Sequence, residues 1–165
     1  MRRFHLIAAM GALTLGNAWW STRSGPTVLL HATDLRVGDR VEALAASDKR
    51  CAVVVAFRSD CPFCARAADR ERSRSATLPT TWLAPSDDHG AAGYAEQVHP
   101  DSRVTISDAA FASMKVEAVP AAVLVDSDGW IKRAWPYRGD EDVPALIKAC
   151  TMPTSPPDTV DARGA

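Results

Sequence analysis

Two apolar runs dominate the pattern of hydrophobic and polar positions along the chain. Residues 51–57 are apolar and rich in β-branched side chains and end at polar residues 58–60, and residues 121–125 are equally apolar. Short apolar runs bounded by turn residues predict buried strands. The second run is followed by Asp126-Ser127-Asp128-Gly129, which predicts a turn with positive φ at the glycine, after which residues 130–134 return as a hairpin partner.

Weaker patterns predict the elements around these two strands. The other expected core strands are residues 80–84 and 103–106, and the expected helices are residues 62–76, 91–98 and 109–114 and a last helix with an acidic start at residues 140–142 that runs through Leu146 to Cys150. Two further segments predict an N-terminal extension of the sheet. Residues 27–31 form a short apolar run typical of an edge strand, and residues 33–41 alternate around Gly38-Asp39 as a strand or hairpin would.

Length and charge narrow the class of protein. The 165 residues suffice for one well-buried domain, which we expect at residues 25–150. Lys and Arg number 19 and Asp and Glu 20, a net charge of −1, so nothing indicates a nucleic-acid surface. Residues 151–165 contain three prolines and little to bury, which predicts a disordered C-terminal tail.

The N-terminal residues 1–24 have the pattern of an export signal or membrane anchor. Two arginines precede the apolar residues 6–20, which would span about 22 Å as a helix against a hydrocarbon core of about 30 Å. Cleavage after Ala18 and retention as a tether, with Trp19-Trp20 at the outer interface, both fit the sequence. Either outcome predicts a periplasmic or otherwise extracytoplasmic domain, where disulfides can persist.

The first buried strand leads into Cys61-Pro62-Phe63-Cys64, which carries the chemistry predicted for this chain. Proline suits the first turn of a helix, where its missing N–H costs nothing, so Cys61 is expected at the helix N-terminus. Backbone N–H groups and the helix dipole favour a thiolate there. Cys64 lies on the same helical face and within reach of a disulfide. We therefore expect Cys61 to be the exposed attacking sulfur and Cys64 the buried resolving one.

Two other interpretations of a Cys-x-x-Cys pair are a structural zinc site and an inert disulfide. A zinc site needs a second pair of ligands, and the candidates are scattered without the usual spacing: Cys51, Cys150, His89 and His99. An inert disulfide would fit the spacing as well. The agreement of strand, turn, proline and helix favours redox chemistry over both, and no metal is expected.

The order of the expected elements is that of the thioredoxin fold, with Val119-Pro120 directly before the second buried strand. In detail the chain resembles exported thiol:disulfide oxidoreductases of the TlpA/ResA type over about residues 35–150. The residues that carry this likeness, besides the dithiol, are Val37-Gly38-Asp39, Val116, Val119-Pro120, Val125-Asp126, Gly129-Trp130-Ile131 and Gly139. The resemblance implies an α/β domain in which helices flank a central mixed sheet, with an N-terminal strand or hairpin extension.

The same resemblance implies roles for individual residues. Cys61 resembles the nucleophile, Cys64 the resolving thiol and Pro120 the cis-proline that faces them. A cis X-Pro bond makes a tight turn, which would present the backbone of Val119 beside the sulfurs to bind an extended substrate segment, with Pro62 and Phe63 on the same surface. No cofactor is implied. The implied partners are protein thiols or disulfides and a redox partner that restores the dithiol.

Two residues depart from the family pattern. Asp60 stands where an aromatic residue usually precedes the first cysteine, and its carboxylate opposes a thiolate, although Arg58 and Arg66 could offset it. Val55 replaces a buried acid or amide that in relatives helps to move protons to and from the resolving thiol. Both departures leave the direction of electron flow open, and we favour a reductase.

Other functions and a second cysteine pair stay open. Reduced Cys61 and Cys64 could hold copper with His89 or His99, as in a metallochaperone, although such carriers typically have a wider Cys-x-x-x-Cys spacing. A redox-inactive interaction domain is opposed by the intact cysteines. Cys51 and Cys150 either form a structural disulfide or are free, buried thiols.

Overall fold

The computed structural model describes residues 32–46, 51–75 and 78–152. The expected export signal, the expected edge strand at residues 27–31 and the tail from residue 153 onwards lie outside the described residues. Among the helices of the described part, none is long and apolar enough to cross a membrane.

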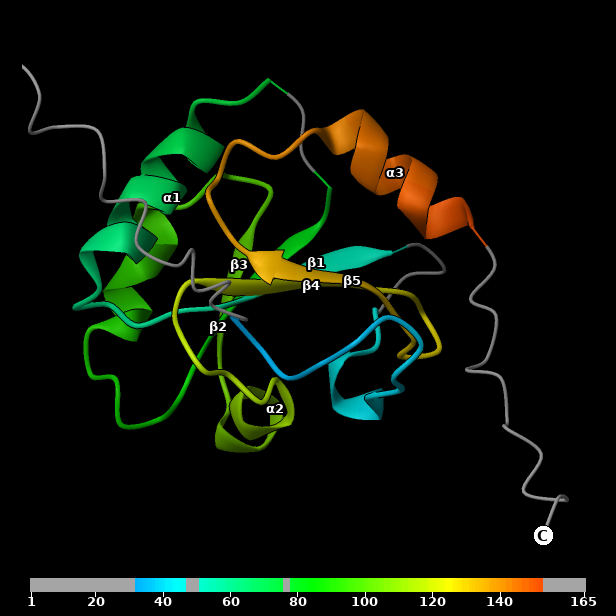
Figure 1. Cartoon of the computed structure of the whole chain (residues 1–165). Coiled ribbons are helices and arrows are strands. Elements are labelled where there is room, and N and C mark those ends of the chain that lie inside the picture. Colours follow the sequence, from blue (N-terminus) through cyan, green and yellow to red (C-terminus); the bar gives the residue numbers. More distant parts are fainter. Residues whose placement is uncertain (1–31, 47–50, 76–77, 153–165) are drawn as a thin grey trace, which may run out of the picture.

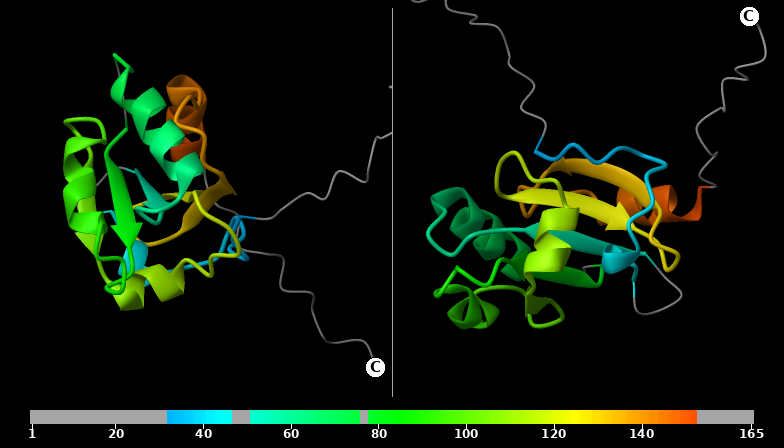
Figure 2. Two further views of the ribbon diagram at one scale, coloured as in Figure 1. Left: turned by 90° about the vertical axis from the view of Figure 1, so that its left-hand side faces the viewer. Right: turned by 90° about the horizontal axis from the view of Figure 1, so that it is seen from below.

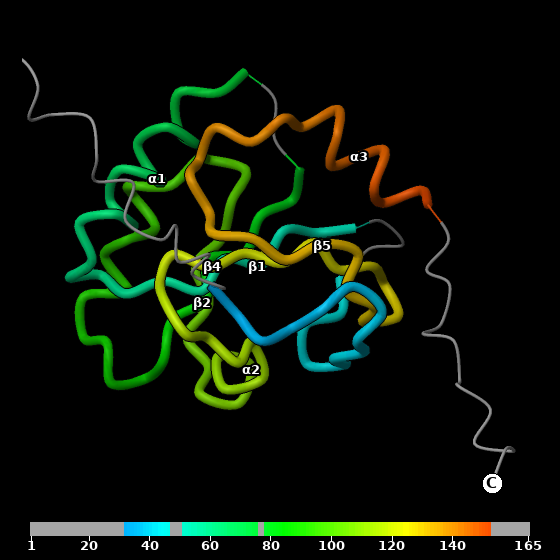
Figure 3. Tube along the Cα trace, in the orientation of Figure 1, coloured from blue at the N-terminus to red at the C-terminus, as the bar shows by residue number. Residues whose placement is uncertain are grey.

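Five strands form one mixed sheet in the order β3-β2-β1-β4-β5. The strands are β1 (Ala52–Ala56), β2 (Thr80–Ala84), β3 (Arg103–Ile106), β4 (Ala121–Val125) and β5 (Ile131–Pro136). The first three strands are parallel to one another, whereas β4 is antiparallel to both β1 and β5. The tube trace in Figure 3 shows β1 and β4 side by side in the middle of the domain.

Helices cover both faces of this sheet (Figures 1 and 2). One face packs against α1 (Pro62–Arg72), α3 (Val143–Thr151) and the 3-10 helix η2 (Ala91–Glu96). The opposite face packs against α2 (Asp108–Ser113) and the 3-10 helix η1 (Glu42–Leu44). This arrangement of a mixed sheet between helices is the thioredoxin fold, as the sequence resemblance implied.

The central strand β1 contributes to the core on both sides of the sheet. Val53 and Val55 pack in the cluster beneath α1 and α3, while Val54 and Ala56 pack in the cluster beneath α2. All five residues of β1 are buried. A strand buried on both faces has a continuous apolar sequence rather than an alternating one, which explains why this strand could be predicted.

Several predicted boundaries are confirmed by the structure. β2, β3 and β4 cover the predicted residues, and α2 begins within one residue of its predicted start, with Ser107 as its N-cap, where the Ser107 hydroxyl accepts a hydrogen bond from the backbone N–H of Ala110. Gly129 has φ of +83°, as its place in the hairpin turn required. A side chain there would also collide with the backbone of Val41, 2.8 Å from the position of its Cβ. Both the positive φ and the close approach of the Val41 backbone therefore require glycine at this position.

The prediction of a strand or hairpin at residues 33–41 is wrong. This segment makes only isolated β-bridges, at Thr33 and at Arg40, and is otherwise irregular. The Asp39 carboxylate accepts a hydrogen bond from the backbone N–H of Arg36 at 2.8 Å and closes a local turn. Local side-chain bonds of this kind compete with the ladder that a hairpin would need.

Two predicted helices differ in kind or length. The expected helix at residues 91–98 is the 3-10 helix η2, and Gly93 in its middle disfavours an α-helix. Helix α1 ends at Arg72 instead of near Ala76. The hydroxyl of Ser73 donates a hydrogen bond to a carbonyl of the last turn, which satisfies one of the groups left open at a helix end.

Candidate active site

The dithiol lies where β1 leaves the sheet and α1 begins. Cys61 is the N-cap of α1 and Pro62 occupies its first turn, as the sequence predicts. The backbone N–H of Cys64 donates to the Cys61 sulfur at 3.2 Å. A sulfur that accepts a helix N-terminal N–H is placed where negative charge on it is favoured.

The two sulfurs differ in their exposure. Cys61 is half-buried, whereas Cys64, on the buried face of α1, is fully buried, and neither is in a disulfide. Burial raises the pKa of the Cys64 thiol well above its ordinary value, and its hydrogen bond with Cys61 raises it further. The reachable sulfur is therefore Cys61, while Cys64 stays protonated until it is needed.

The Val119–Pro120 segment faces the dithiol. Its peptide bond is cis. The Cys61 thiol points at the Val119 carbonyl, with 3.7 Å between sulfur and oxygen. The structure thus brings Cys61, Cys64, Val119 and Pro120 together, although 58 positions separate Cys61 from Val119 in sequence.

A groove of about 600 Å³ runs beside this segment. The residues that line it include Val119, Pro120, Phe63 and Ala67 of α1. Phe63 is 62% exposed, which is unusual for so large an apolar side chain and leaves most of its surface open to a partner. Of the predicted substrate-contacting residues, Phe63, Val119 and Pro120 line this groove and Pro62 adjoins it in α1.

The loop before Cys61 is held from the side of η2. The backbone N–H and the hydroxyl of Ser59 both donate to the Asp88 carboxylate, the former at 2.7 Å. Burial opposes ionisation of Asp88, but the hydrogen bonds from Ser59 and Gly90 outweigh it and hold the pKa of Asp88 below its ordinary value. A side chain at Gly90 would collide with Ser59, so the loop and its support are closely packed.

The charges around the dithiol only partly match the sequence expectation. Arg58 pairs with Asp87 at 3.0 Å, and Arg66 lies over the ring of Phe63, 4.5 Å from its centroid. Neither arginine forms a salt bridge with the exposed Asp60, although the negative charge of Asp60 acts on Arg58. The same charge also contributes to raising the pKa of Cys64.

The second cysteine pair lies at the other end of β1. Cys51, directly before the strand, is joined to Cys150 in α3 by a disulfide with a Cα–Cα distance of 5.8 Å. Both alternatives were open from sequence, because spacing cannot show that the last helix ends beside the central strand. The bridge lies in the core and takes no part in the groove.

Two buried polar residues near the dithiol were missed by sequence reasoning. Glu71 of α1 is fully buried and accepts hydrogen bonds from Trp82 Nε1 at 2.7 Å and from Ser102 Oγ at 3.0 Å. Its spacing of seven from Cys64, on the buried face of the helix, was a signal that could have found it. Tyr94 of η2 is 1% exposed, and no sequence pattern places it beside the active site.

No metal cluster is found among residues 32–46, 51–75 and 78–152. No group of three or more His, Cys, Asp or Glu side chains is arranged there to hold an ion. His89 and His99 are therefore not assembled with the two cysteines into the copper site considered from sequence.

Comparison with known proteins gives similarities of chain path. No protein-family model and no curated protein matches the sequence. Among solved structures the chain is similar to MTB dsbF, with a TM-score of 0.47 and 18% identity over 67% of this chain and 83% of that one. It is also similar to StoA from Bacillus subtilis, with a TM-score of 0.46 and 11% identity over 62% and 83% of the two chains. A thiol-disulfide isomerase from Corynebacterium glutamicum has a TM-score of 0.43 and 15% identity over 76% and 97%.

Proposed function

We propose that this protein is a thiol:disulfide oxidoreductase that reduces disulfides in proteins outside the cytoplasm. The observation that carries the proposal is the arrangement of the dithiol itself. A half-buried Cys61 caps a helix and accepts the N–H of Cys64, while the fully buried Cys64 lies on the same helix face. This is the asymmetry that an attacking and a resolving thiol need.

The proposed reaction has two exchange steps. The Cys61 thiolate attacks one sulfur of a substrate disulfide, forms a mixed disulfide and releases the other substrate sulfur as a thiolate. Cys64 then attacks the Cys61 sulfur, which forms the Cys61–Cys64 disulfide and releases the second substrate thiol. Two electrons pass from the protein to the substrate, and a dithiol redox partner must supply two electrons to restore the reduced pair.

The groove beside Val119–Pro120 supports an extended protein segment as the substrate. The Val119 carbonyl faces the Cys61 sulfur, so a chain lying along the groove would place its own cysteine between backbone partners and the exposed Phe63. Main-chain pairing of this type binds many sequences, while side-chain pockets select among them. The proposed partners are therefore proteins with accessible disulfides.

The Cys51–Cys150 disulfide supports a location outside the cytoplasm. Disulfides of this kind persist in oxidising compartments and are rare in the cytosol. The proposed export signal or anchor at the N-terminus agrees with this location.

The deciding experiment measures exchange and potential on the exported protein. We expect the reduced protein to reduce a disulfide-bonded protein substrate, and the Cys61–Cys64 pair to equilibrate with glutathione at a potential below that of the substrate disulfide. Exchange in the opposite direction only, with a strongly oxidising potential, would make the protein an oxidase. Absence of exchange in both directions would reject the proposed function.

A further inference from the structure

The second exchange step poses a problem that the proposed mechanism leaves unsolved. Cys64 must become a thiolate to attack, yet burial raises its pKa, and so does the negative charge of Asp60. The side chain of Val55, in the strand that leads to the dithiol, is apolar and fully buried, so it can neither move a proton nor donate a hydrogen bond.

Glu71, a buried acid within α1, cannot support a thiolate at Cys64. The carboxylate of Glu71 lies two turns beyond Cys64 and already accepts hydrogen bonds from Trp82 and Ser102. An acceptor that is occupied in this way offers no donor to a thiolate. The acids that act electrostatically on Cys64 or on the nearby Tyr94 are Asp60, Asp69 and Asp88, and their negative charges oppose a second negative charge.

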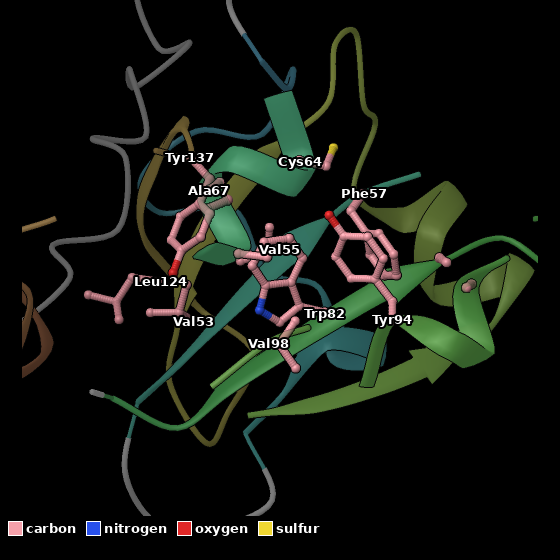
Figure 4. Close-up of a cluster of buried hydrophobic side chains, with 14 of the residues drawn as sticks. Val53, Val55, Phe57, Cys64, Ala67, Trp82, Tyr94, Val98, Leu124 and Tyr137 are labelled. Carbon is pink, nitrogen blue, oxygen red and sulfur yellow. The ribbon is translucent and has the colours of Figure 1, made fainter. Parts of the chain in front are cut away.

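Tyr94, in η2, has a hydroxyl that is a hydrogen-bond donor on the Cys64 side of the core (Figure 4). Its ring is held between Phe57 and Trp82, with centroid separations of 4.5 and 5.7 Å. Figure 4 shows its hydroxyl directed toward the Cys64 side of the cluster, and the charges of Cys64 and Cys61 act on it. Within the described residues, it is the buried side-chain oxygen that has no hydrogen-bond partner.

The state of this hydroxyl fits a donor rather than an acid. Burial raises the pKa of Tyr94, and the neighbouring sulfurs raise it further, so the phenol keeps its proton at every pH at which the protein works. A buried hydroxyl without a partner destabilises the fold, and native proteins rarely keep one without a use. A negative charge that forms on the Cys64 sulfur would supply the missing acceptor.

We propose that Tyr94 is a positioning residue that donates a hydrogen bond to the Cys64 thiolate during the second exchange step, directly or through one water. The inference rests on the proposed function. Cys64 gives its proton to the departing substrate sulfur or to solvent, the Cys64–Cys61 bond forms, and the bond between Cys61 and the substrate sulfur breaks. Tyr94 keeps its own proton and lowers the cost of the transient charge.

The test is Tyr94→Phe, which removes the hydroxyl and keeps the ring. In a Cys61→Ser background we expect the pKa of Cys64, measured from the pH dependence of its alkylation, to rise by about one pH unit. With both cysteines present, resolution of a preformed mixed disulfide should slow about ten-fold. The first step, measured in a Cys64→Ser background, should keep its rate. The fold should remain stable, because an unpaired buried hydroxyl is lost.

Tyr137→Phe is the matched control. Tyr137 is also buried, but its hydroxyl lies near Glu71 and points away from Cys64 (Figure 4). We expect this variant to leave the pKa of Cys64 unchanged, and since Tyr137 also lines the groove, the comparison uses this pKa and not the rates with substrate. Equal pKa values in Tyr94→Phe and the parent, or an equal effect of both variants, would overturn the role of Tyr94. If the protein with both cysteines exchanges no disulfides, the proposed function fails, while the alkylation comparison still reports on Tyr94.

Discussion

The two cysteine pairs at the opposite ends of β1 have the same chemistry and opposite states. Cys51 and Cys150 are bonded, are separated by 99 residues in sequence and lie in the core. Cys61 and Cys64 are free, belong to one helical turn, and have one sulfur within reach of a partner. One strand thus separates a cross-link from the proposed reaction centre.

Sequence separation explains much of this difference. Closing a loop of about 100 residues removes a large entropy from the unfolded chain, worth up to about 4.7 kcal/mol, whereas closing a turn of four residues removes much less. The long-range bridge is therefore tied to the folded state, while the local pair can open and close without unfolding the domain. The exposure of the sulfur atoms accounts for the remaining difference between the two pairs, because exchange requires that an attacking thiolate reach the sulfur.

The largest expected effect comes from breaking the local pair. Cys61→Ser should reduce exchange with a protein disulfide by roughly 10³-fold or more, because the attacking sulfur is lost. Cys64→Ser should keep the attack and accumulate a mixed disulfide, visible on a non-reducing gel. Full turnover by Cys64→Ala without a trapped adduct would contradict a dithiol mechanism.

Breaking the long-range pair should lower stability and leave chemistry unchanged. Replacing Cys51 and Cys150 together by alanine should lower the free energy of unfolding by up to about 4.7 kcal/mol, measured by denaturant titration. Exchange per folded molecule should stay within about two-fold of the parent. Mild reductant should expose two thiols in denatured parent protein, and four would show that the bridge opens as easily as the active pair.

Changes in the groove should lower the rate of exchange with protein disulfides and leave the rate with small disulfides unchanged. Phe63→Ala should lower kcat/KM for a protein disulfide roughly five- to ten-fold, because an exposed aromatic contact is lost, and leave the rate with oxidised glutathione unchanged. Val37→Ala is the control, since Val37 is 64% exposed and lies outside the groove. An equal loss in both variants would argue against the groove as the substrate site.

The smallest expected effect concerns Asp60. Its negative charge helps to raise the pKa of Cys64, so Asp60→Asn should lower that pKa by a few tenths of a pH unit. The pH profile of mixed-disulfide resolution should then move toward lower pH. Asp101→Asn removes the same charge at an exposed site elsewhere and should leave the profile in place. A move toward higher pH would show that Asp60 acts by a different route.

Local signals explain which parts of the fold could be predicted from sequence. The β1 strand, the proline in the first turn of α1 and the glycine of the hairpin each depend on nearby residues, and each lies where predicted. The prediction of an N-terminal hairpin is wrong because a local turn closed by Asp39 forms in place of the strand pairing that the alternation of apolar and polar residues indicated. Pattern alone does not weigh these competing bonds.

The residues of the candidate site likewise fall into those that local sequence signals predict and those that they do not. The roles expected for Cys61 and Cys64 follow from their motif, and the pairing of the motif with Val119-Pro120 follows from a family resemblance. Tyr94 reaches the site from η2, whose position is set by packing against Phe57 and Trp82. Neither contact has a signal in the local sequence, so a residue of this kind is found only once the tertiary structure is known.

The long-range disulfide also has a consequence for chain connectivity. Its ring runs from Cys51 to Cys150 and contains all five strands of the sheet together with the dithiol. The Cα atoms of Cys51 and Cys150 lie 5.8 Å apart, so a short peptide linker between these two residues could replace the disulfide. Such a linker would remove residues 32–46, whose buried side chains Ala32, Leu35 and Leu44 pack on one face of the sheet, so we expect a circularly permuted domain to be less stable than the parent while it keeps the dithiol within its ring.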